Sequence, residues 1–162
     1  MRRFSSVAGL ALAVLAVVGL ASPVSAEHHR PFKGHFEGDV TVTPLAPPFV
    51  SVLVEAKGHA NHLGHFTLAI PHVVNRATRM ATGSYEFTTA NGDTLTADFT
   101  GTATPTATPG VLYIEETATI TGGTGRFAGA TGSFTTERWY DTIAGTTEGS
   151  FEGTISSPGD ED

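Results

Sequence analysis

Apolar and polar side chains alternate along most of the chain after Lys33, which is the pattern of strands that bury one face. In the first such segment, Phe36 and Val40 share one face, while Glu37 and Asp39 share the other. Seven further segments alternate in the same way. The eight expected strands cover residues 33–43, 50–57, 66–74, 83–90, 95–99, 111–121, 134–142 and 146–155.

The connections between these segments are short and no segment has a helical period, so we expect consecutive strands to pair as an antiparallel meander. Asn91-Gly92-Asp93 predicts a tight hairpin turn because Asn and Gly tolerate positive φ. Pro71 lies inside the third segment and predicts an edge or a bulge there. Closure into a barrel is favoured over an open sandwich. The predicted fold is all-β, a single closed eight-stranded antiparallel β-barrel.

The N-terminal segment has the three parts of a secretory signal peptide. Arg2 and Arg3 form a basic start, residues 7–20 are mostly apolar, and Val24-Ser25-Ala26 offers small residues for cleavage. The apolar part is short for a membrane span, so a secreted or periplasmic protein is favoured over a retained anchor. The predicted organisation is a signal peptide over 1–26, a flexible arm over 27–32, the barrel over 33–156 and an acidic tail over 157–162.

The chain carries 16 acidic and 9 basic residues, for a formal net charge of −7. An acidic chain is a poor match for nucleic acid, which needs clustered Lys and Arg, and for anionic membrane surfaces. We therefore expect no nucleic-acid partner and no membrane contact after signal cleavage. The absence of cysteine excludes disulfides, thiol catalysis and Cys-ligated metals.

A glycine-rich stretch, Ile120 to Phe134, joins the sixth and seventh expected strands. Its glycines permit backbone conformations that residues with a Cβ avoid, and Phe127 is spaced to fold back and plug one end of a barrel. A phosphate-binding loop is the competing interpretation, but neither a helix nor a Lys-Ser/Thr pair follows the glycines. The stretch therefore predicts a structural corner.

Residues Thr121 to Gly132, with the sequence TGGTGRFAGATG, resemble a signature shared by the allene oxide cyclase and dirigent barrels. In both families a strand ends in G-G-T/S-G, followed by x-F, small residues and a glycine before the next strand. Glu115-Glu116-Thr117 also resembles the acidic pair before this turn in allene oxide cyclases. The chain looks more like exported bacterial relatives of this calycin-like barrel than like either plant enzyme.

The resemblance implies an apolar lumen open at one end, and reactions steered by confinement without a cofactor. Allene oxide cyclases direct the ring closure of an unstable fatty-acid epoxide, and dirigent proteins direct the coupling or cyclisation of phenolic intermediates. A cofactor-free cyclase or isomerase with a small apolar ligand is the function that this implies. The related plant barrels form trimers, so a homo-oligomer is also implied, with Trp139 and Val73 on the outer face.

Three polar residues lie on otherwise apolar faces: His72, Glu116 and Arg138. If the sixth and seventh strands pair, Glu116 and Arg138 meet in the lumen, and a buried charge needs such a partner. The functional hypothesis makes Glu116 an acid/base or electrostatic steering group. Arg138 or Tyr140 then binds an anionic or phenolic substrate. The alternative is a structural ion pair, or a one-residue bulge that turns these side chains outward.

The predicted ligand-binding residues line the apolar lumen: Phe36, Phe66, His72, Phe87, Phe99 and Phe134. An open lumen without turnover would make the chain a lipocalin-like carrier. If the phenyl rings fill the interior completely, no ligand can enter, and the chain would be a structural or adhesive exported domain.

Histidines suggest two metal hypotheses. His59, His62 and His65 are spaced by three residues, as ligands of Zn, Cu or Ni can be, with a solvated loop as the alternative. The second hypothesis depends on cleavage after Ala26, which would make His29 the third residue of the mature chain. A free amine, two backbone nitrogens and that imidazole form a square-planar site for Cu(II) or Ni(II).

Overall fold

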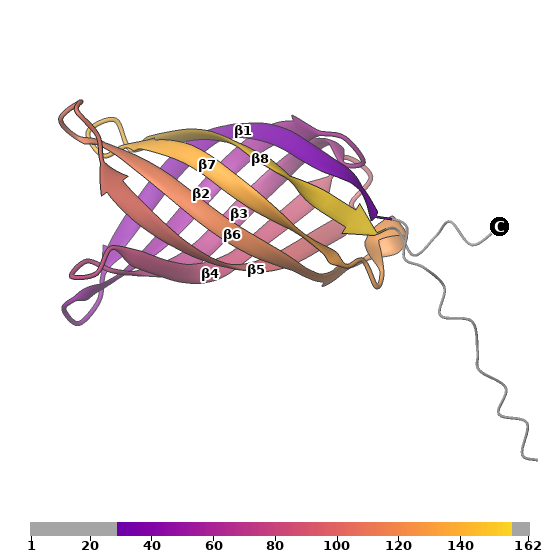
Figure 1. Ribbon diagram of the computed structural model, residues 1–162, viewed down its shortest axis with the longest axis horizontal. Coiled ribbons are helices and arrows are strands. Elements are labelled where there is room, and N and C mark those ends of the chain that lie inside the picture. Colours follow the sequence, from indigo (N-terminus) through magenta and orange to yellow (C-terminus); the bar gives the residue numbers. More distant parts are fainter. Residues whose placement is uncertain (1–28, 157–162) are drawn as a thin grey trace, which may run out of the picture.

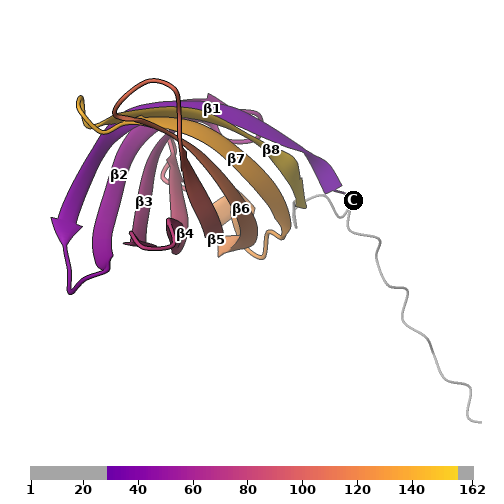
Figure 2. The same ribbon diagram turned by 60° about the vertical axis from the view of Figure 1, so that its left-hand side comes forward.

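The computed structural model of the protein describes residues 29–156 and confirms the predicted fold. Each strand pairs antiparallel with the next, and β8 pairs with β1, so the sheet closes into a barrel (Figures 1 and 2). The strands are β1 (His29–Pro44), β2 (Phe49–Ala60), β3 (Gly64–Asn75), β4 (Met80–Thr89), β5 (Thr94–Pro105), β6 (Val111–Gly123), β7 (Gly132–Asp141) and β8 (Thr146–Ser156). A short 3-10 helix, η1 (Gly125–Phe127), follows β6. Within residues 29–156, no helix has the length and apolar character needed to cross a membrane.

The two ends of the barrel differ. One end, which we call the mouth, carries the connections 45–48, 76–79, 106–110 and 142–145. The other end, the closed end, carries the turns 61–63 and 90–93 and the segment 124–131 with η1 (Figure 1). The glycine-rich stretch therefore lies at the end of the barrel opposite the mouth.

The first strand begins earlier than expected. Residues 29–32 belong to β1 and pair with the end of β8, so the prediction of a flexible arm is wrong for these residues. Phe32 is fully buried, and its ring packs edge-on against Phe134 with centroids 5.5 Å apart. This burial anchors a segment whose polar sequence suggested a solvent-exposed arm. The predicted signal peptide, residues 27–28 and the acidic tail lie outside the described residues.

Pro71 makes β3 neither an edge nor a bulged strand, contrary to the prediction. A closed barrel has no edge strand. The register with β4 is the same on both sides of the proline, because Ala69 faces Glu86 and His72 faces Gly83. The β3–β4 pairing is interrupted only at residues 70–71, where the proline has no N–H to donate.

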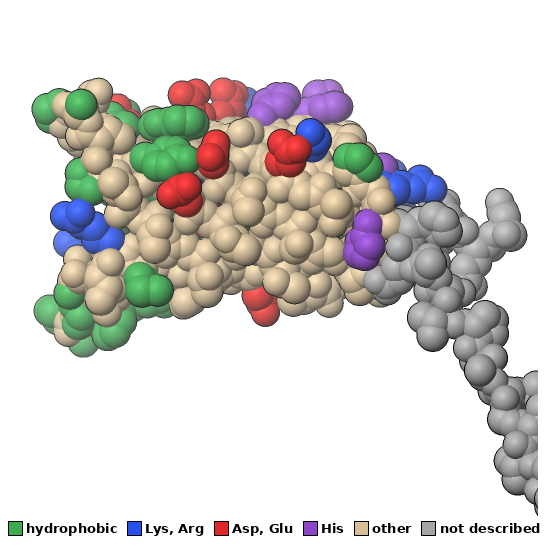
Figure 3. Space-filling view, in the orientation of Figure 1, with side chains coloured by type: hydrophobic (Ala, Val, Ile, Leu, Met, Phe, Trp, Pro, Cys, Tyr) green, Lys and Arg blue, Asp and Glu red, His purple; other side chains and the backbone are tan. Residues whose placement is uncertain are grey.

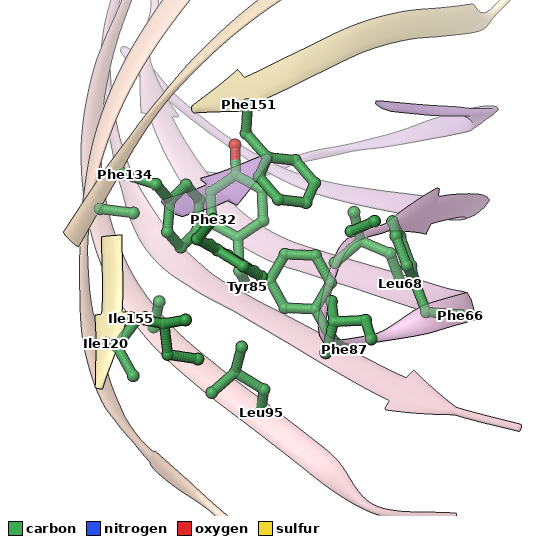
Figure 4. Close-up of a cluster of buried hydrophobic side chains, with 14 of the residues drawn as sticks. Phe32, Phe66, Leu68, Tyr85, Phe87, Leu95, Ile120, Phe134, Phe151 and Ile155 are labelled. Atoms are coloured by element: carbon green, nitrogen blue, oxygen red, sulfur yellow. The ribbon is translucent and has the colours of Figure 1, made fainter. Parts of the chain in front are cut away.

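Aromatic side chains fill the half of the lumen next to the closed end (Figure 4). Phe87 is fully buried at the centre of this group. Its ring centroid lies within 6.2 Å of those of Phe32, Phe66, Tyr85, Phe134 and Phe151. Burial of each such ring contributes about 2–3 kcal/mol, and favourable ring pairs add about 0.5–1.5 kcal/mol.

The glycine-rich segment seals this end, as the sequence predicted. Phe127 of η1 is buried in the same core. Gly125 has a φ of 58°, and a Cβ at this position would collide with the Asp93 carboxylate. The backbone N–H of Thr124 donates to the Thr94 carbonyl at 2.9 Å. These contacts tie η1 to the start of β5, so the segment acts as a structural corner.

Candidate functional site

A buried charged network lies in the middle of the lumen. Nε of Arg138, on β7, donates to the two Glu116 oxygens at 3.3 and 3.1 Å, and Nη2 donates to Oε1 at 2.8 Å. The Tyr85 hydroxyl, from β4, donates to Oε2 of the same carboxylate. The Glu116 side chain is fully buried and that of Arg138 is 2 % exposed. Both oxygens of Glu116 are therefore engaged by protein donors.

Strand pairing brings the two charges together as the sequence predicted. In the β6–β7 pair, Ile114 lies opposite Arg138 and Glu116 lies opposite Thr136. The charged residues are thus diagonal neighbours on the lumen face, within reach of long side chains. The register of this pair is unbroken from β6 to β7, so no bulge turns them outward.

Three polar residues of this region each face a glycine on a neighbouring strand. The pairs are Gly101 with Glu116, Gly149 with Arg138, and Gly83 with His72. A Cβ at any of the three glycines would collide with the facing side chain. The glycines therefore provide the space in which large polar side chains lie inside a narrow barrel.

Burial and pairing set the protonation states of the network. Burial by itself lowers the pKa of Arg138, but the charge and hydrogen bonds of Glu116 outweigh it, so the net shift of that pKa is upward. Burial, followed by the charge of Glu116, raises the pKa of Tyr85 well above its ordinary value. At neutral pH a guanidinium and a neutral phenol therefore both donate to Glu116.

His72 is a further polar residue of the lumen. Its Nδ1 lies 2.9 Å from the Ile70 carbonyl, which can only accept, so Nδ1 carries the proton. Burial lowers the pKa of His72; the Ile70 hydrogen bond opposes that shift and the charge of Arg138 adds to it. In the neutral ring Nε2 is therefore an unprotonated acceptor.

A cavity of about 550 Å³ lies between the network and the mouth. Its volume falls within the range of roughly 300–1,000 Å³ that is usual for small-molecule sites. Its walls are aliphatic side chains of β1, β2, β3, β5 and β6. The polar residues that line it are His72, Arg76, Arg79, Arg138, Tyr140 and Thr142. None of the lining residues is acidic, so the cavity combines apolar walls with positive charge.

Arg138 links the network to the cavity. Its Nε and Nη2 bind Glu116, and within the described part of the chain no hydrogen bond occupies Nη1. Arg138 lines the cavity, whereas Glu116 does not. A ligand in the cavity can therefore reach the guanidinium, while the carboxylate beneath stays covered.

The structure divides the predicted site residues into two groups. His72, Arg138 and Tyr140 line the cavity, and Glu116 lies beneath it. The phenylalanines predicted to bind ligand pack into the buried core instead: Phe36, Phe66, Phe87, Phe99 and Phe134. None of them lines the mouth cavity. Alternation showed which side chains point inward, but it did not show at which end of the barrel the rings leave room.

Four polar residues of the site were missed: Tyr85, Arg76, Arg79 and Thr142. Tyr85 lies in the expected strand 83–90 on the same face as Phe87, and a phenol hydroxyl on this apolar face was the signal that could have added it. Arg76 and Arg79 lie in a segment without period, between two strands. Their position in the chain was the signal that could have found them. In an antiparallel barrel the connections that follow odd-numbered strands all lie at one end, so both arginines could have been placed at that opening.

No family model matches this sequence, and no curated protein matches it. Among solved structures, the fold is similar to that of the pterocarpan synthase dirigent protein GePTS1, with a TM-score of 0.55 and 12 % sequence identity. The match covers 91 % of this chain and 99 % of that chain. The fold is a dirigent-like barrel. This agrees with the resemblance of the glycine-rich stretch.

On the outer wall of this dirigent-like barrel, His35, His59 and His65 lie side by side across β1, β2 and β3. Neighbouring ring centroids are 6.4 and 5.1 Å apart. His62 lies apart from them in the β2–β3 turn, with Nε2 3.1 Å from the Pro31 carbonyl. Within residues 29–156, no group of three or more His, Cys, Asp or Glu side chains is arranged to hold a metal ion. The spacing of His59, His62 and His65 therefore does not produce a shared ligand set.

The second metal hypothesis concerns His29, which begins β1. The amine and backbone nitrogens that would complete its site belong to Glu27 and His28, outside the described residues. Copper binding at His29 stays a prediction that depends on cleavage after Ala26.

A larger groove, of about 700 Å³, runs along the outer wall beside His35, His59 and Trp139. All of its polar side chains are exposed. It therefore lacks the buried, oriented polar groups that distinguish the lumen, and we place the candidate site in the mouth cavity.

Proposed function

We propose that the barrel binds a small, largely apolar molecule with an anionic or phenolic head in the mouth cavity, and steers its cyclisation or isomerisation without a cofactor. One observation carries the proposal: the cavity has aliphatic walls, a buried guanidinium at its base and no acidic lining residue. Such a site favours an apolar body and a negatively polarised oxygen. Confinement in one conformation supplies the remaining selectivity.

The polar groups have distinct roles in this proposal. The free Nη1 of Arg138 donates to the head of the ligand and stabilises negative charge that develops there. Nε2 of His72 accepts a proton from the ligand or from a water molecule. Tyr140 lines the cavity beside them. Glu116 and Tyr85 act as positioning residues, because they hold the guanidinium without reaching the cavity.

The structural comparison bears on this proposal through the fold alone. The similar barrel is that of a pterocarpan synthase dirigent protein, so a barrel of this fold occurs in a synthase. At 12 % identity the likeness carries the fold alone, so the argument for this chain rests on its own cavity and its own polar residues.

A matched titration tests the binding step. We would measure displacement of an anionic naphthalene sulfonate probe by a long-chain carboxylic acid and by its methyl ester. Ala103→Phe fills the cavity and should weaken both ligands at least about tenfold, since binding requires the cavity volume. Arg138→Met combined with Glu116→Gln, which leaves no unpaired buried charge, should remove the preference for the acid over the ester. Lys57→Met, on the outer wall, is the control and should change neither. Unaltered binding in a folded Ala103→Phe protein would place the ligand elsewhere.

Binding without turnover is the second candidate function. It is favoured by Glu116, whose two oxygens are already engaged and which cannot itself abstract a proton from a ligand in the cavity. Mass spectrometry of ligands that co-purify with the protein identifies the compound class. Incubation of that compound, or of its unstable precursor, with wild type and with His72→Gln then separates an enzyme from a carrier.

A further inference from the structure

We propose that the mouth of the barrel docks on the surface of an anionic phospholipid bilayer. The surface in question is the mouth rim, which we define as the connections 45–48, 76–79, 106–110 and 142–145 with the adjoining Phe49 and Met80. This inference concerns the outside of the barrel and does not depend on what the cavity holds.

Large apolar side chains project from the mouth rim into solvent. Leu45 begins the β1–β2 connection and Phe49 follows it, Met80 follows the β3–β4 connection, and Ile143 lies in the β7–β8 connection. Ile143 is 82 % exposed and Met80 is 53 % exposed. Figure 3 shows hydrophobic side chains gathered at this end of the barrel, together with Lys or Arg side chains. Apolar tips around an opening are a surface that lipid can cover.

The rim is positively charged although the chain is acidic. The four connections contain Arg76 and Arg79 and no Asp or Glu. Both arginines are exposed and also line the cavity. Asp141 precedes the fourth connection, and its Oδ1 accepts the backbone N–H groups of Ile143 and Ala144 at 2.9 Å. Guanidinium groups beside apolar tips match a layer of lipid phosphates above acyl chains.

The rim is ordered before it meets any partner. The Arg76 N–H donates to the Pro48 carbonyl at 2.9 Å, which joins the first two connections. The Thr142 N–H donates to the Gly110 carbonyl at 2.8 Å, which joins the last two. Ordered tips lose little conformational entropy when they insert into lipid.

Arg79 occupies a backbone conformation that suits glycine or asparagine. Its φ is 59°, in the left-handed region, and it lies in a turn closed by its own N–H to the Asn75 carbonyl. A residue with a Cβ is strained there. The presence of arginine at this strained position is consistent with a surface contact that requires its positive charge.

A second copy of the chain is the competing occupant of an exposed apolar rim. In a symmetric pair of mouths, Arg76 and Arg79 would face their own copies, with no acid on the rim to compensate them. An anionic lipid surface turns the same charges into attraction. The expectation of no membrane contact came from the net charge of the whole chain. The fold places positive charge at the rim and most acidic side chains elsewhere, so the net charge does not describe the rim.

Vesicle flotation tests the proposal. The protein recovered after export would be mixed with phosphatidylcholine vesicles, with or without about one third phosphatidylglycerol, at low and high salt. Wild type should float with the anionic vesicles at low salt. Arg76→Gln with Arg79→Gln should weaken binding roughly 25-fold, taking about fivefold for each arginine. Ile143→Asp should weaken it at least about tenfold. Leu53→Asp, at an exposed apolar position halfway along β2, is the matched control and should bind as wild type does.

Three results would overturn the proposal. One is the absence of wild-type binding to anionic vesicles at low salt. Another is equal loss in Leu53→Asp and Ile143→Asp, which would point to the side wall. The third is a wild-type dimer in sedimentation that Ile143→Asp converts to a monomer, without vesicle binding by either, which would assign the rim to self-association.

Discussion

Replacing Arg138 by methionine is expected to destabilise the barrel strongly, and a second substitution is expected to reverse much of the loss. The change removes three hydrogen bonds from Glu116 and its counter-charge, and leaves a fully buried carboxyl that retains only the Tyr85 hydroxyl. Removal of one partner of a buried pair costs about 3–5 kcal/mol of unfolding free energy. Glu116→Gln should cost less, about 1–3 kcal/mol, because its amide oxygen can still accept a hydrogen bond from Nε of Arg138. The guanidinium that loses its counter-charge also lies beside the cavity and not in the packed core.

The decisive variant combines Arg138→Met with Glu116→Gln. Glu116→Gln alone destabilises, but in the Arg138→Met background it removes the uncompensated charge and should restore about 2 kcal/mol or more. Urea denaturation of the four proteins gives the coupling free energy. Lys57→Met and Glu37→Gln form a control cycle on an exposed pair 4.0 Å apart, which should show no measurable coupling. If Glu116→Gln lowers stability equally in both backgrounds, the two charges do not stabilise each other and our description of the network fails.

Three further predictions follow from single residues. Because the pKa of His72 is lowered in the folded state, protonation opposes folding, and wild-type stability should fall as pH drops below the ordinary value of 6.5. His72→Gln should make the unfolding free energy, measured in urea, less dependent on pH between about pH 7 and pH 5. Gly101→Ala introduces a Cβ against Glu116 and should cost about 1–3 kcal/mol in thermal or urea unfolding, whereas the exposed Thr100→Ala should cost little. Phe127→Ala opens a void at the closed end and should cost about 3–5 kcal/mol, while probe binding at the mouth stays unchanged.

The sequence was enough to predict the barrel because its strands obey one rule. Period-two alternation identifies strands and their inward faces, and short connections force neighbours to pair. Glu116 and Arg138 could be paired in advance for the same reason, since both lie on the lumen faces of consecutive strands. Phe127 could be assigned to the closed end because it lies in a connection, where only an end can receive it.

Other features depend on distances along the barrel axis, which alternation does not encode. Phe99 and Arg138 both point inward, yet one packs in the core and the other lines a cavity. Phe32 showed that a buried ring can order a segment with a polar sequence. The glycines opposite polar residues were also beyond reach, because the pairing of Gly101 with Glu116 depends on the register of β5 with β6.

Substitutions at Arg138 and at Ile143 should separate the two proposals. Arg138 is 2 % exposed and paired with Glu116, so the pair adds little to the field outside the barrel. Arg138→Met combined with Glu116→Gln should therefore abolish the preference for acidic ligands and leave vesicle binding unchanged. Ile143 is 82 % exposed at the rim and does not line the cavity, so Ile143→Asp should weaken vesicle binding while the cavity keeps its preference for the acid over the ester. A variant pair that failed to separate the two readouts would mean that the rim and the cavity form a single anion site.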